Sequence, residues 1–318
     1  MTLDRIRPAL AAGAAAVALA AAGQAAAQDP DSCREVAFSD VGWTDITATT
    51  ALASTVLEGL GYQPSTDVVS VPVTYVSLAN GDIDVFLGNW MPTMTADIEP
   101  YTEAGTVEVV RANLEGAKYT LAVPQYVHDA GVQNFGDLAT HEEAFDGKIY
   151  GIEPGNDGNR LIQEMIDSDA FGLGGWELEA SSEQGMLSQV DRATRRDEWI
   201  VFLGWEPHPM NANHDIAYLA GGDDWFGPDF GGATVYTNVR SGYLEECPNV
   251  GRLLQNLEFT LSMENQVMAM ILDENMQADA AARQYLTENP EVLARWLDGV
   301  TTFEGEPGLA AVSEHLGL

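Results

Sequence analysis

Three tryptophans each lie at or just beyond the end of an expected strand. Strand ends are where α/β proteins place ligand sites, and an indole ring near a turn presents its face to a cleft instead of filling a core. That face attracts cations, and it suits a quaternary ammonium group, which has no N–H to donate. The sequence therefore predicts a cation site built from the phrases Gly42-Trp43-Thr44-Asp45, Gly88-Asn89-Trp90-Met91-Pro92 and Gly204-Trp205-Glu206-Pro207-His208-Pro209.

The three phrases form a site only if the chain brings them together, since a single tryptophan is more often part of a core or an interface. Trp296 illustrates this alternative, because it shares an apolar helical face with Val292 and Leu293. Four aromatic faces around a desolvated cation would contribute roughly 4–8 kcal/mol, and micromolar affinity requires about 8 kcal/mol. An aromatic box is therefore energetically sufficient to hold a small quaternary ammonium ligand.

The first 27 residues are typical of a secretory signal peptide. A basic start with Arg5 and Arg7 precedes an alanine-rich apolar stretch over residues 9–22, and small residues follow up to Ala27. The apolar stretch is short for a membrane span of about 20 residues, so a membrane anchor is the less favoured alternative. We expect cleavage near Ala27, a periplasmic location and no direct membrane anchor.

The chain contains two cysteines, Cys33 and Cys247. In an oxidising compartment, two cysteines of a secreted chain most simply pair with each other, and two free thiols are the alternative. We therefore expect a disulfide between Cys33 and Cys247.

The chain is strongly acidic, with 49 acidic and 14 basic residues and a formal net charge of −35. Such a charge repels nucleic acid and anionic lipid and favours the approach of cationic solutes, so we expect no nucleic-acid partner. Adaptation of the surface to salty surroundings is the alternative explanation for most of this charge, because electrostatic steering falls off within about 8–10 Å at physiological salt.

Short strand patterns alternate with helical stripes along the first two thirds of the chain, which predicts an α/β protein with a parallel sheet. From about Val235 the sequence is expected to be strongly helical. Thr44 or Asp45 is the expected N-cap of the first helix. The expected strands cover residues 35–38, 67–73, 81–87, 119–123, 148–152 and 198–203, and the expected helices cover residues 45–60, 74–79, 159–166, 183–196, 249–261, 263–276 and 279–297.

About 290 residues after the signal peptide suit two domains. Trp43 and Trp90 belong to the first set of elements, and Tyr119 and Trp205 belong to the second. If the C-terminal helices return to the first set, the chain crosses between the lobes twice and forms a hinge. We therefore predict a two-lobed clamp that closes on its ligand, with lobe A formed by residues 28–115 and 224–318 and lobe B by residues 116–223.

Six short phrases occur in order along nearly the whole chain after residue 27. They are Gly-Trp-Thr-Asp, Leu-Ala-Asn-Gly-Asp-Ile-Asp-Val, Gly-Asn-Trp-Met-Pro, Ala-Lys-Tyr-Thr-Leu-Ala-Val-Pro, Gly-Ile-Glu-Pro-Gly-Asn and Gly-Trp-Glu-Pro-His-Pro-Met. Together they resemble the periplasmic substrate-binding proteins of ABC importers for glycine betaine and choline, and the choline-binding branch is the most similar. Each phrase alone is weakly specific, whereas six in order are highly specific.

The resemblance implies a type II periplasmic binding-protein fold, with two lobes, a ligand cleft between them and a hinge of two chain crossings. It implies a monomer that needs no cofactor, captures choline and delivers it to the permease subunits of an ABC importer. The cysteine pair also fits the choline-binding branch. The ligand residues implied are an aromatic box of Trp43, Trp90, Tyr119 and Trp205, with Asp45 and Asn156 as polar partners of the choline hydroxyl.

The charge of the expected site favours choline over glycine betaine or proline betaine. A carboxylate such as Asp45 can accept a hydrogen bond from the choline hydroxyl and complement the positive charge, although it could also serve as a helix N-cap. The carboxylate of a betaine would need donors, and Lys118 is expected to face away because its neighbour Tyr119 points to the cleft. Backbone donors or Asn156 leave the betaines open as an alternative.

The loop over residues 153–159 is rich in glycine and asparagine and precedes a helix. It lacks the P-loop pattern and the full dinucleotide fingerprint, so we do not expect nucleotide binding. A turn that caps the helix and directs Asn156 into the cleft fits better. Asp157 is a secondary candidate ligand, with a role as the helix cap as its alternative.

Other functions predict features that the sequence lacks. A hydrolase of choline esters would need a nucleophile with a base, and we find no Gly-x-Ser-x-Gly elbow and no convincing Ser-His-Asp set, so we expect no enzyme. His208 and His214 lack the spacing of metal ligands, so we expect structural or surface histidines and no metal site. A sugar receptor stays open as an alternative, since tryptophan also stacks on pyranose rings.

Overall fold

The computed structural model describes residues 28–318, so the expected signal peptide over residues 1–27 lies outside the described residues. The strands of the described part form one nine-stranded sheet in the order β2-β1-β3-β9-β4-β7-β5-β6, with β8 paired to β4. The strands are β1 (Glu35–Asp40), β2 (Gln63–Val68), β3 (Val85–Met91), β4 (Val107–Pro124), β5 (Lys148–Tyr150), β6 (Glu177–Glu179), β7 (Phe202–Glu206), β8 (Ile216–Tyr218) and β9 (Gly232–Arg240).

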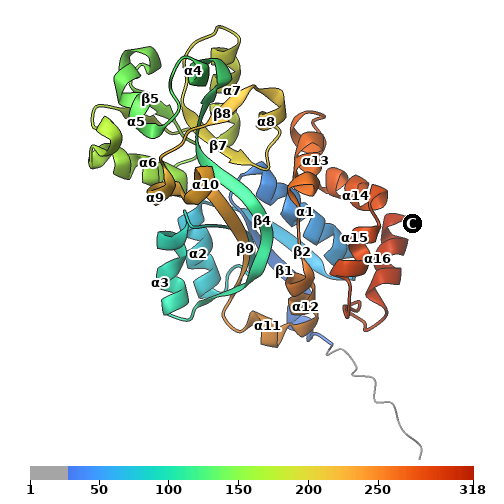
Figure 1. The fold of residues 1–318 in the computed structure, drawn as a ribbon. Helices are drawn as coiled ribbons and strands as arrows, with labels where there is room; N and C mark the ends of the chain where they lie inside the picture. Colours follow the sequence, from blue (N-terminus) through green and yellow to red (C-terminus); the bar gives the residue numbers. More distant parts are fainter. Residues whose placement is uncertain (1–27) are drawn as a thin grey trace, which may run out of the picture.

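Helices surround this sheet, and the C-terminal helices return to the first part of the chain, where α13, α14 and α16 pack against α1 (Figure 1). No helix within residues 28–318 is long and apolar enough to cross a membrane. The helices are α1 (Thr44–Gly59), α2 (Val71–Asn80), α3 (Thr95–Glu103), α4 (Gln125–Asp129), α5 (Phe135–Leu138), α6 (Asp157–Asp167), α7 (Glu183–Thr194), α8 (Met210–Asn213), α9 (Asp223–Phe226), α10 (Pro228–Gly231), α11 (Tyr243–Glu246), α12 (Pro248–Asn256), α13 (Leu261–Leu272), α14 (Ala278–Glu288), α15 (Glu291–Trp296) and α16 (Gly308–Leu316), with short 3-10 turns at Asp31–Cys33, Ala139–Phe145 and Ala170–Gly172.

The elements gather in two lobes at opposite ends of the sheet (Figure 1). One lobe holds β1–β3, α1–α3 and the C-terminal helices, and the other holds α4–α8 and β5–β8. Strand β4 belongs to both, because residues 107–118 pair with β9 and residues 118–124 pair with β7 and β8. The register of β4 against β9 shifts three times between Val109 and Ala117, and such irregularities bend a strand. A bent strand shared by both lobes suits a hinge.

The expected parallel sheet is correct only in part. Strand β1 pairs in parallel with β2 and β3, and β5 with β6 and β7, but β4 and β9 pair antiparallel with all their neighbours. The helical expectation from Val235 is wrong for β9. Its Val, Tyr and Thr residues favour a strand, and its position between β3 and β4 supplies partners on both sides.

The strand expected over residues 67–73 ends early, because α2 begins at Val71. Pro72 lies in the first turn of α2, where a missing N–H does not break a helical hydrogen bond. The apolar run of valines around it has no clear periodicity, and this explains the wrong assignment.

Helix α1 buries the stripe expected from the sequence, including Ile46, Leu52 and Leu57. The expected N-cap, Thr44 or Asp45, is wrong. Both residues lie inside the first turn, and the N-cap is Trp43, whose extended backbone precedes the helix and whose side chain makes no capping hydrogen bond. The start of α1 therefore depends on a partner from elsewhere in the chain.

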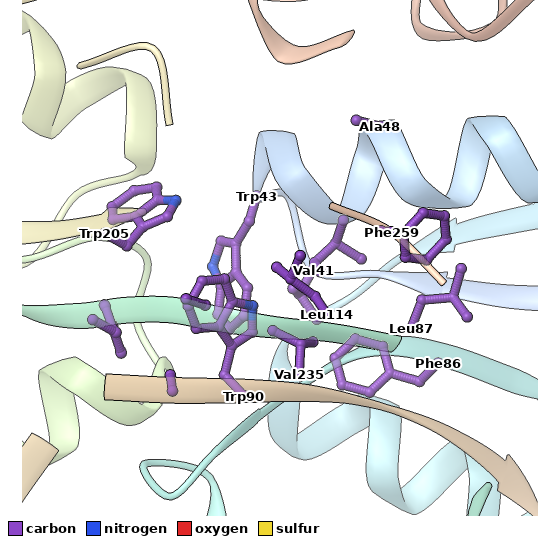
Figure 2. Packing of buried hydrophobic residues seen from close by; sticks show 14 of the residues in the cluster. Val41, Trp43, Ala48, Phe86, Leu87, Trp90, Leu114, Trp205, Val235 and Phe259 are labelled. Carbon is purple, nitrogen blue, oxygen red and sulfur yellow. The ribbon is translucent and has the colours of Figure 1, made fainter. Parts of the chain in front are cut away.

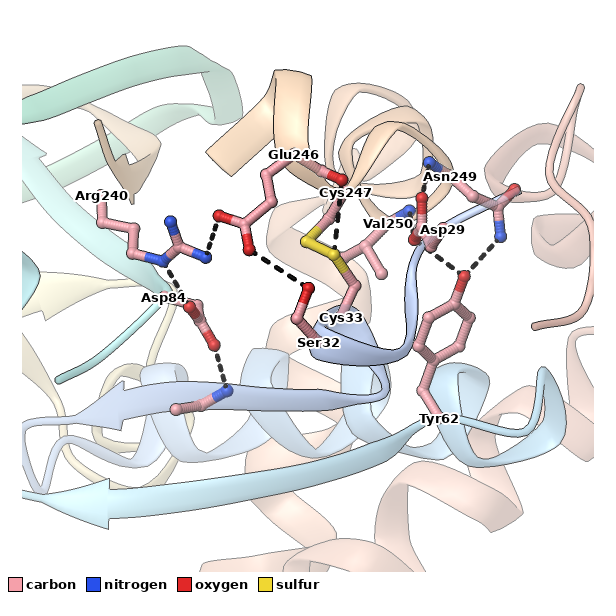
Figure 3. Close-up of a disulfide and its surroundings, with 11 residues drawn as sticks. Asp29, Ser32, Cys33, Tyr62, Asp84, Arg240, Glu246, Cys247, Asn249 and Val250 are labelled. Carbon is pink, nitrogen blue, oxygen red and sulfur yellow. Dashed lines mark hydrogen bonds and ion pairs between the residues drawn. A yellow bond between two sulfur atoms is a disulfide. The ribbon is translucent and has the colours of Figure 1, made fainter. Parts of the chain in front are cut away.

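A disulfide joins Cys33 to Cys247, with 5.7 Å between their Cα atoms, as the cysteine count predicts (Figure 3). Beside it, Asp29 accepts hydrogen bonds from the backbone N–H groups of Asn249 (2.7 Å) and Val250 (3.1 Å) at the start of α12. The Tyr62 hydroxyl donates to the same carboxylate at 2.9 Å. These bonds fasten the N-terminal segment to the returning C-terminal helices.

Candidate functional site

A small cavity between the two lobes has mainly aromatic walls. Figure 2 labels its three tryptophans, Trp43, Trp90 and Trp205. The space free of protein atoms at this place is about 240 Å³, part of it open to solvent, and the centre of a water-sized sphere can reach only about 10 Å³ of it. The walls of the cavity therefore lie close together. Its lining residues are Trp43, Asp45, Trp90, Tyr119, Ile152 and Trp205.

Each lobe contributes two rings to the cavity. Trp43 directly precedes α1, and Trp90 is the penultimate residue of β3. Tyr119 on β4 and Trp205 on β7 are direct partners in the antiparallel register of these strands. In Figure 2, Trp205 extends from its strand in one lobe, while Trp43 and Trp90 lie together on the side of α1.

The rings form adjoining walls and not a stack. The Tyr119 centroid lies 6.0 Å from that of Trp90 and 6.3 Å from that of Trp205, and the interplanar angles are 61° and 82°. Each of the four rings is at most 5% exposed. A cation inside these walls would be desolvated, and this is the condition in which a cation–π contact is strongest, at about 2 kcal/mol or more.

Asp45 is the one carboxylate among the lining residues. Its Oδ2 accepts a hydrogen bond from Trp90 Nε1 at 3.1 Å, whereas its buried Oδ1 has no partner among the described residues. Burial first, and then the charge of Glu183, raise the pKa of Asp45 to about 8. A buried acceptor without a partner costs about 1–3 kcal/mol, so a donor or a cation in the cavity would stabilise it.

Two further acidic residues lie just behind the rings. Glu153 accepts a hydrogen bond from Trp43 Nε1 at 2.6 Å, and burial raises its pKa to about 7. Burial also raises the pKa of Asp157 to about 6. Burial disfavours the charged forms of both groups. A ligand cation nearby would stabilise those charged forms and so lower the pKa values.

Asn156 and Asp157 stand behind Tyr119 and do not line the cavity. Asn156 is the N-cap of α6, and its Oδ1 accepts hydrogen bonds from the Tyr119 hydroxyl (3.0 Å) and from the Asn159 backbone N–H (2.9 Å). Its amide donates to Asp157 at 3.1 Å, and Asp157 is the first residue of the helix. Their contacts in the structure therefore hold Tyr119 and the start of α6 in place.

Gly158 allows this close approach between Tyr119 and α6. A β-carbon at position 158 would overlap the Tyr119 hydroxyl. Any larger residue would push the ring toward the cavity or move the helix, so a glycine is required here by space and not by backbone conformation.

The basic residue of the six phrases faces away from the cavity, as expected. Lys118 lies 3.6 Å from Glu206 and 5.8 Å from the centroid of the Tyr218 ring. No lysine or arginine is among the residues that line the cavity. The cavity therefore offers no side-chain cation to a carboxylate.

Sequence reasoning missed Ile152 and Glu183. Ile152, in the loop after β5, forms part of the cavity wall. The phrase Gly-Ile-Glu-Pro-Gly-Asn contains it and could have identified it from the sequence. His208 is buried beside Trp205, and its Nε2 lies 3.3 Å from Glu183 Oε1, which agrees with a structural histidine. Within residues 28–318, the one cluster with metal-like spacing consists of Glu246 and the disulfide pair, so it offers no free thiolate.

Residues 34–288 match the protein family described as the substrate binding domain of ABC-type glycine betaine transport systems. The chain belongs to this family. The resemblance inferred from the six phrases is therefore confirmed. Members of this family and the similar solved structures are transport substrate-binding proteins and not enzymes, and such proteins of ABC importers act outside the cytoplasm.

Two solved structures and one curated relative are especially similar to this chain. An ABC-transporter choline binding protein in complex with choline is 60% identical, covers 91% of this chain and 100% of its own, and superposes with a TM-score of 0.90. The unliganded, semi-closed form of an ABC-transporter choline binding protein is 61% identical with the same coverage and a TM-score of 0.84. An uncharacterized protein, ORF1, from Chromohalobacter salexigens is 64% identical over 129 residues, which are 41% of this chain and 83% of that protein.

These superpositions confirm the two-lobed α/β substrate-binding fold. Identity and coverage are nearly equal for the two solved structures, yet the TM-score is higher for the choline complex. The four rings of this chain are at most 5% exposed, so the two lobes together cover most of the cavity wall.

Proposed function

We propose that this chain is an extracytoplasmic solute-binding protein that captures choline and delivers it to an ABC importer. One observation supports this most: a cavity whose buried aromatic walls come from both lobes contains a single lining carboxylate with an oxygen free to accept a hydrogen bond. The 60% identical choline binding protein, whose structure contains choline, adds support.

The rings of Trp43, Trp90, Tyr119 and Trp205 surround the methyl groups of the ammonium in this proposal. The choline hydroxyl donates to Asp45 Oδ1, which has no other partner among the described residues. Asn156 acts on the ligand through Tyr119, and Asp157 through Asn156. Charge, hydrogen bond and apolar contact then favour the same small cation.

Glycine betaine is the second candidate, because the description of the family names it. Its carboxylate would meet Asp45 in a cavity that no lysine or arginine lines. It could lie beside Asp45 only while Asp45 keeps its proton, whereas the choline cation stabilises the ionised form, so choline is favoured increasingly as the pH rises.

The same proposal covers delivery. Lobe A consists of residues 28–115 and 224–318 and lobe B of residues 116–223, and the closed form docks as a monomer on the permease subunits in the periplasm. Residues 1–27 serve as a signal peptide cleaved near Ala27. In this proposal the bound choline leaves unchanged and no enzyme step is involved.

Isothermal titration with choline, glycine betaine and a disaccharide tests this function. Choline should bind best and the disaccharide not at all. Trp43→Ala, Trp90→Ala and Trp205→Ala should each weaken choline binding by about 2 kcal/mol or more, or roughly 30-fold, through loss of a desolvated cation–π contact and of apolar contact. Trp199→Ala is the matched control, because Trp199 packs on His141 and Phe145 away from the cavity. Unchanged affinity in two of the three variants would refute the aromatic box.

A further inference from the structure

Helix α1 lacks an N-terminal cap of its own. The first amides of a helix have no partner within the helix, and a Ser, Thr, Asp or Asn at the N-cap usually supplies an oxygen. The N-cap of α1 is Trp43, whose ring lines the cavity and makes no capping hydrogen bond. The Thr44 amide is the first of the helix, at a position that an N-cap side chain does not serve, so its acceptor must come from elsewhere.

The acceptor comes from the other lobe. Glu183, the first residue of α7, accepts the Thr44 backbone N–H on Oε2 at 2.8 Å and the Thr44 hydroxyl on Oε1 at 2.5 Å. Both residues are buried, and 139 positions separate them in the sequence. A carboxylate at the N-terminus of a helix is also favoured by the helix dipole. Opening the lobes would separate Glu183 from α1 and expose the uncapped turn to water.

His208 fixes the orientation of Glu183 within its own lobe. The Met210 backbone N–H donates to His208 Nδ1 at 2.9 Å, so the neutral ring carries its proton on Nε2 and donates it to Glu183 Oε1, which lies 3.3 Å away. The same imidazole ring lies 4.8 Å from the Trp205 ring. The capping carboxylate is thus held beside one wall of the cavity.

Charge links this contact to the ligand. When the lobes close, Glu183 approaches Asp45 in a buried region, and its charge is one cause of the raised pKa of Asp45. Two buried carboxylates repel each other, and a cation between the aromatic walls offsets that repulsion. The contact is therefore most favourable when a cation occupies the cavity.

We propose that Glu183 is a positioning residue that latches the closed state, by capping α1 across the cleft once a cationic ligand is bound. The latch rests on the proposed binding of choline. Glu183 makes no contact with the ligand in this proposal. It affects the lifetime of the closed state, and therefore ligand dissociation, and not ligand association.

Stopped-flow tryptophan fluorescence with choline tests the latch through two rate constants. Thr44→Val removes the hydroxyl that donates to Glu183 and keeps every charge. Loss of a hydrogen bond to a charged group should raise the dissociation rate constant about tenfold or more. The association rate constant should stay within about twofold of the wild type. Thr44→Ser restores the hydroxyl and should restore slow dissociation.

Thr49→Val is the matched control, because within residues 28–318 the Thr49 hydroxyl bonds only to backbone oxygens of its own helix, those of Asp45 (3.1 Å) and Ile46 (3.2 Å). Its dissociation rate constant should equal that of the wild type. Glu183→Gln should also release choline faster, and its effect should not add to that of Thr44→Val, because both changes break one contact.

The outcomes separate the latch from the proposed function. A wild-type chain that fails to bind choline overturns both. A wild type that binds choline while Thr44→Val dissociates at the wild-type rate overturns the latch alone. Fully additive effects of Thr44→Val and Glu183→Gln would also overturn it, since independent sites and not a shared contact would then be acting.

Discussion

Replacing Asp45 with asparagine removes a negative charge from the cavity while keeping the shape of the side chain. The asparagine oxygen can still accept the hydrogen bond that Trp90 Nε1 now donates to Oδ2 at 3.1 Å. What is lost is the charge and the acceptor at Oδ1, which has no partner among the described residues. Choline should therefore bind the variant more weakly, and the loss should depend on pH.

The size of the loss follows from the pKa of Asp45, which is about 8 in the ligand-free cavity. A cation about 5 Å away at an effective dielectric constant near 20 stabilises the carboxylate by about 3 kcal/mol, so bound choline lowers the pKa of Asp45. Binding then releases a proton, and wild-type affinity rises with pH up to the ligand-free pKa. The ratio of the variant to the wild-type dissociation constant should therefore be smallest at pH 6 and largest at pH 8, with an upper bound on the order of 100-fold set by the 3 kcal/mol.

Isothermal titration of both proteins at pH 6, 7 and 8 measures this ratio. Glu153 and Asp157, with pKa values of about 7 and about 6, titrate in the same range but are present in both proteins, so the ratio isolates Asp45. Asp67→Asn is the control, since it removes one charge from the exposed edge strand β2. The variant should also bind glycine betaine better relative to choline. A ratio that does not change with pH would refute the assigned charge.

Two further substitutions test which residues hold Tyr119 in position and how much the disulfide stabilises the fold. Gly158→Ala should weaken choline binding, because overpacking costs about 1–3 kcal/mol and the group displaced is the Tyr119 hydroxyl; titration calorimetry showing wild-type affinity would contradict this. Replacing Cys33 and Cys247 together with serine should lower the free energy of unfolding in urea by up to about 4–5 kcal/mol, since the disulfide closes a loop with a sequence separation of 214, while choline affinity stays within about twofold of the wild type. An unchanged urea midpoint would count against a stabilising role for the disulfide.

Features set by local patterns or by the quoted phrases could be predicted from the sequence. The stripe with Ile46 and Leu52 specifies α1, and the phrases around Trp43, Trp90 and Trp205 predict each ring at or just beyond a strand end, close to where β1, β3 and β7 end. Two cysteines in a secreted chain leave one simple pairing, which the structure contains. These predictions succeed because hydrophobic periodicity, turn residues and cysteine count are properties of short segments or of composition.

Strand β9 shows where local patterns fail. Its residues precede a long helical region, so the sequence suggests a helix, whereas the structure places it between β3 and β4. Strand preference is largely a matter of packing against neighbours, and those neighbours are distant in the sequence. The mixed direction of the sheet, which the sequence does not reveal, has the same cause.

The chemistry of the site depends even more on distant segments. The sequence identifies Asp45 as a candidate, but only its burial in the folded chain, and then the charge of Glu183, raise its pKa to about 8, and Oδ1 is left without a partner among the described residues. Asn156 is a candidate ligand in the sequence, and the structure turns its oxygen toward Tyr119. Glu183 carries no local signal at all. Residue types and their order are local, whereas desolvation, capping across a cleft and the meeting of ring faces arise only when two lobes close.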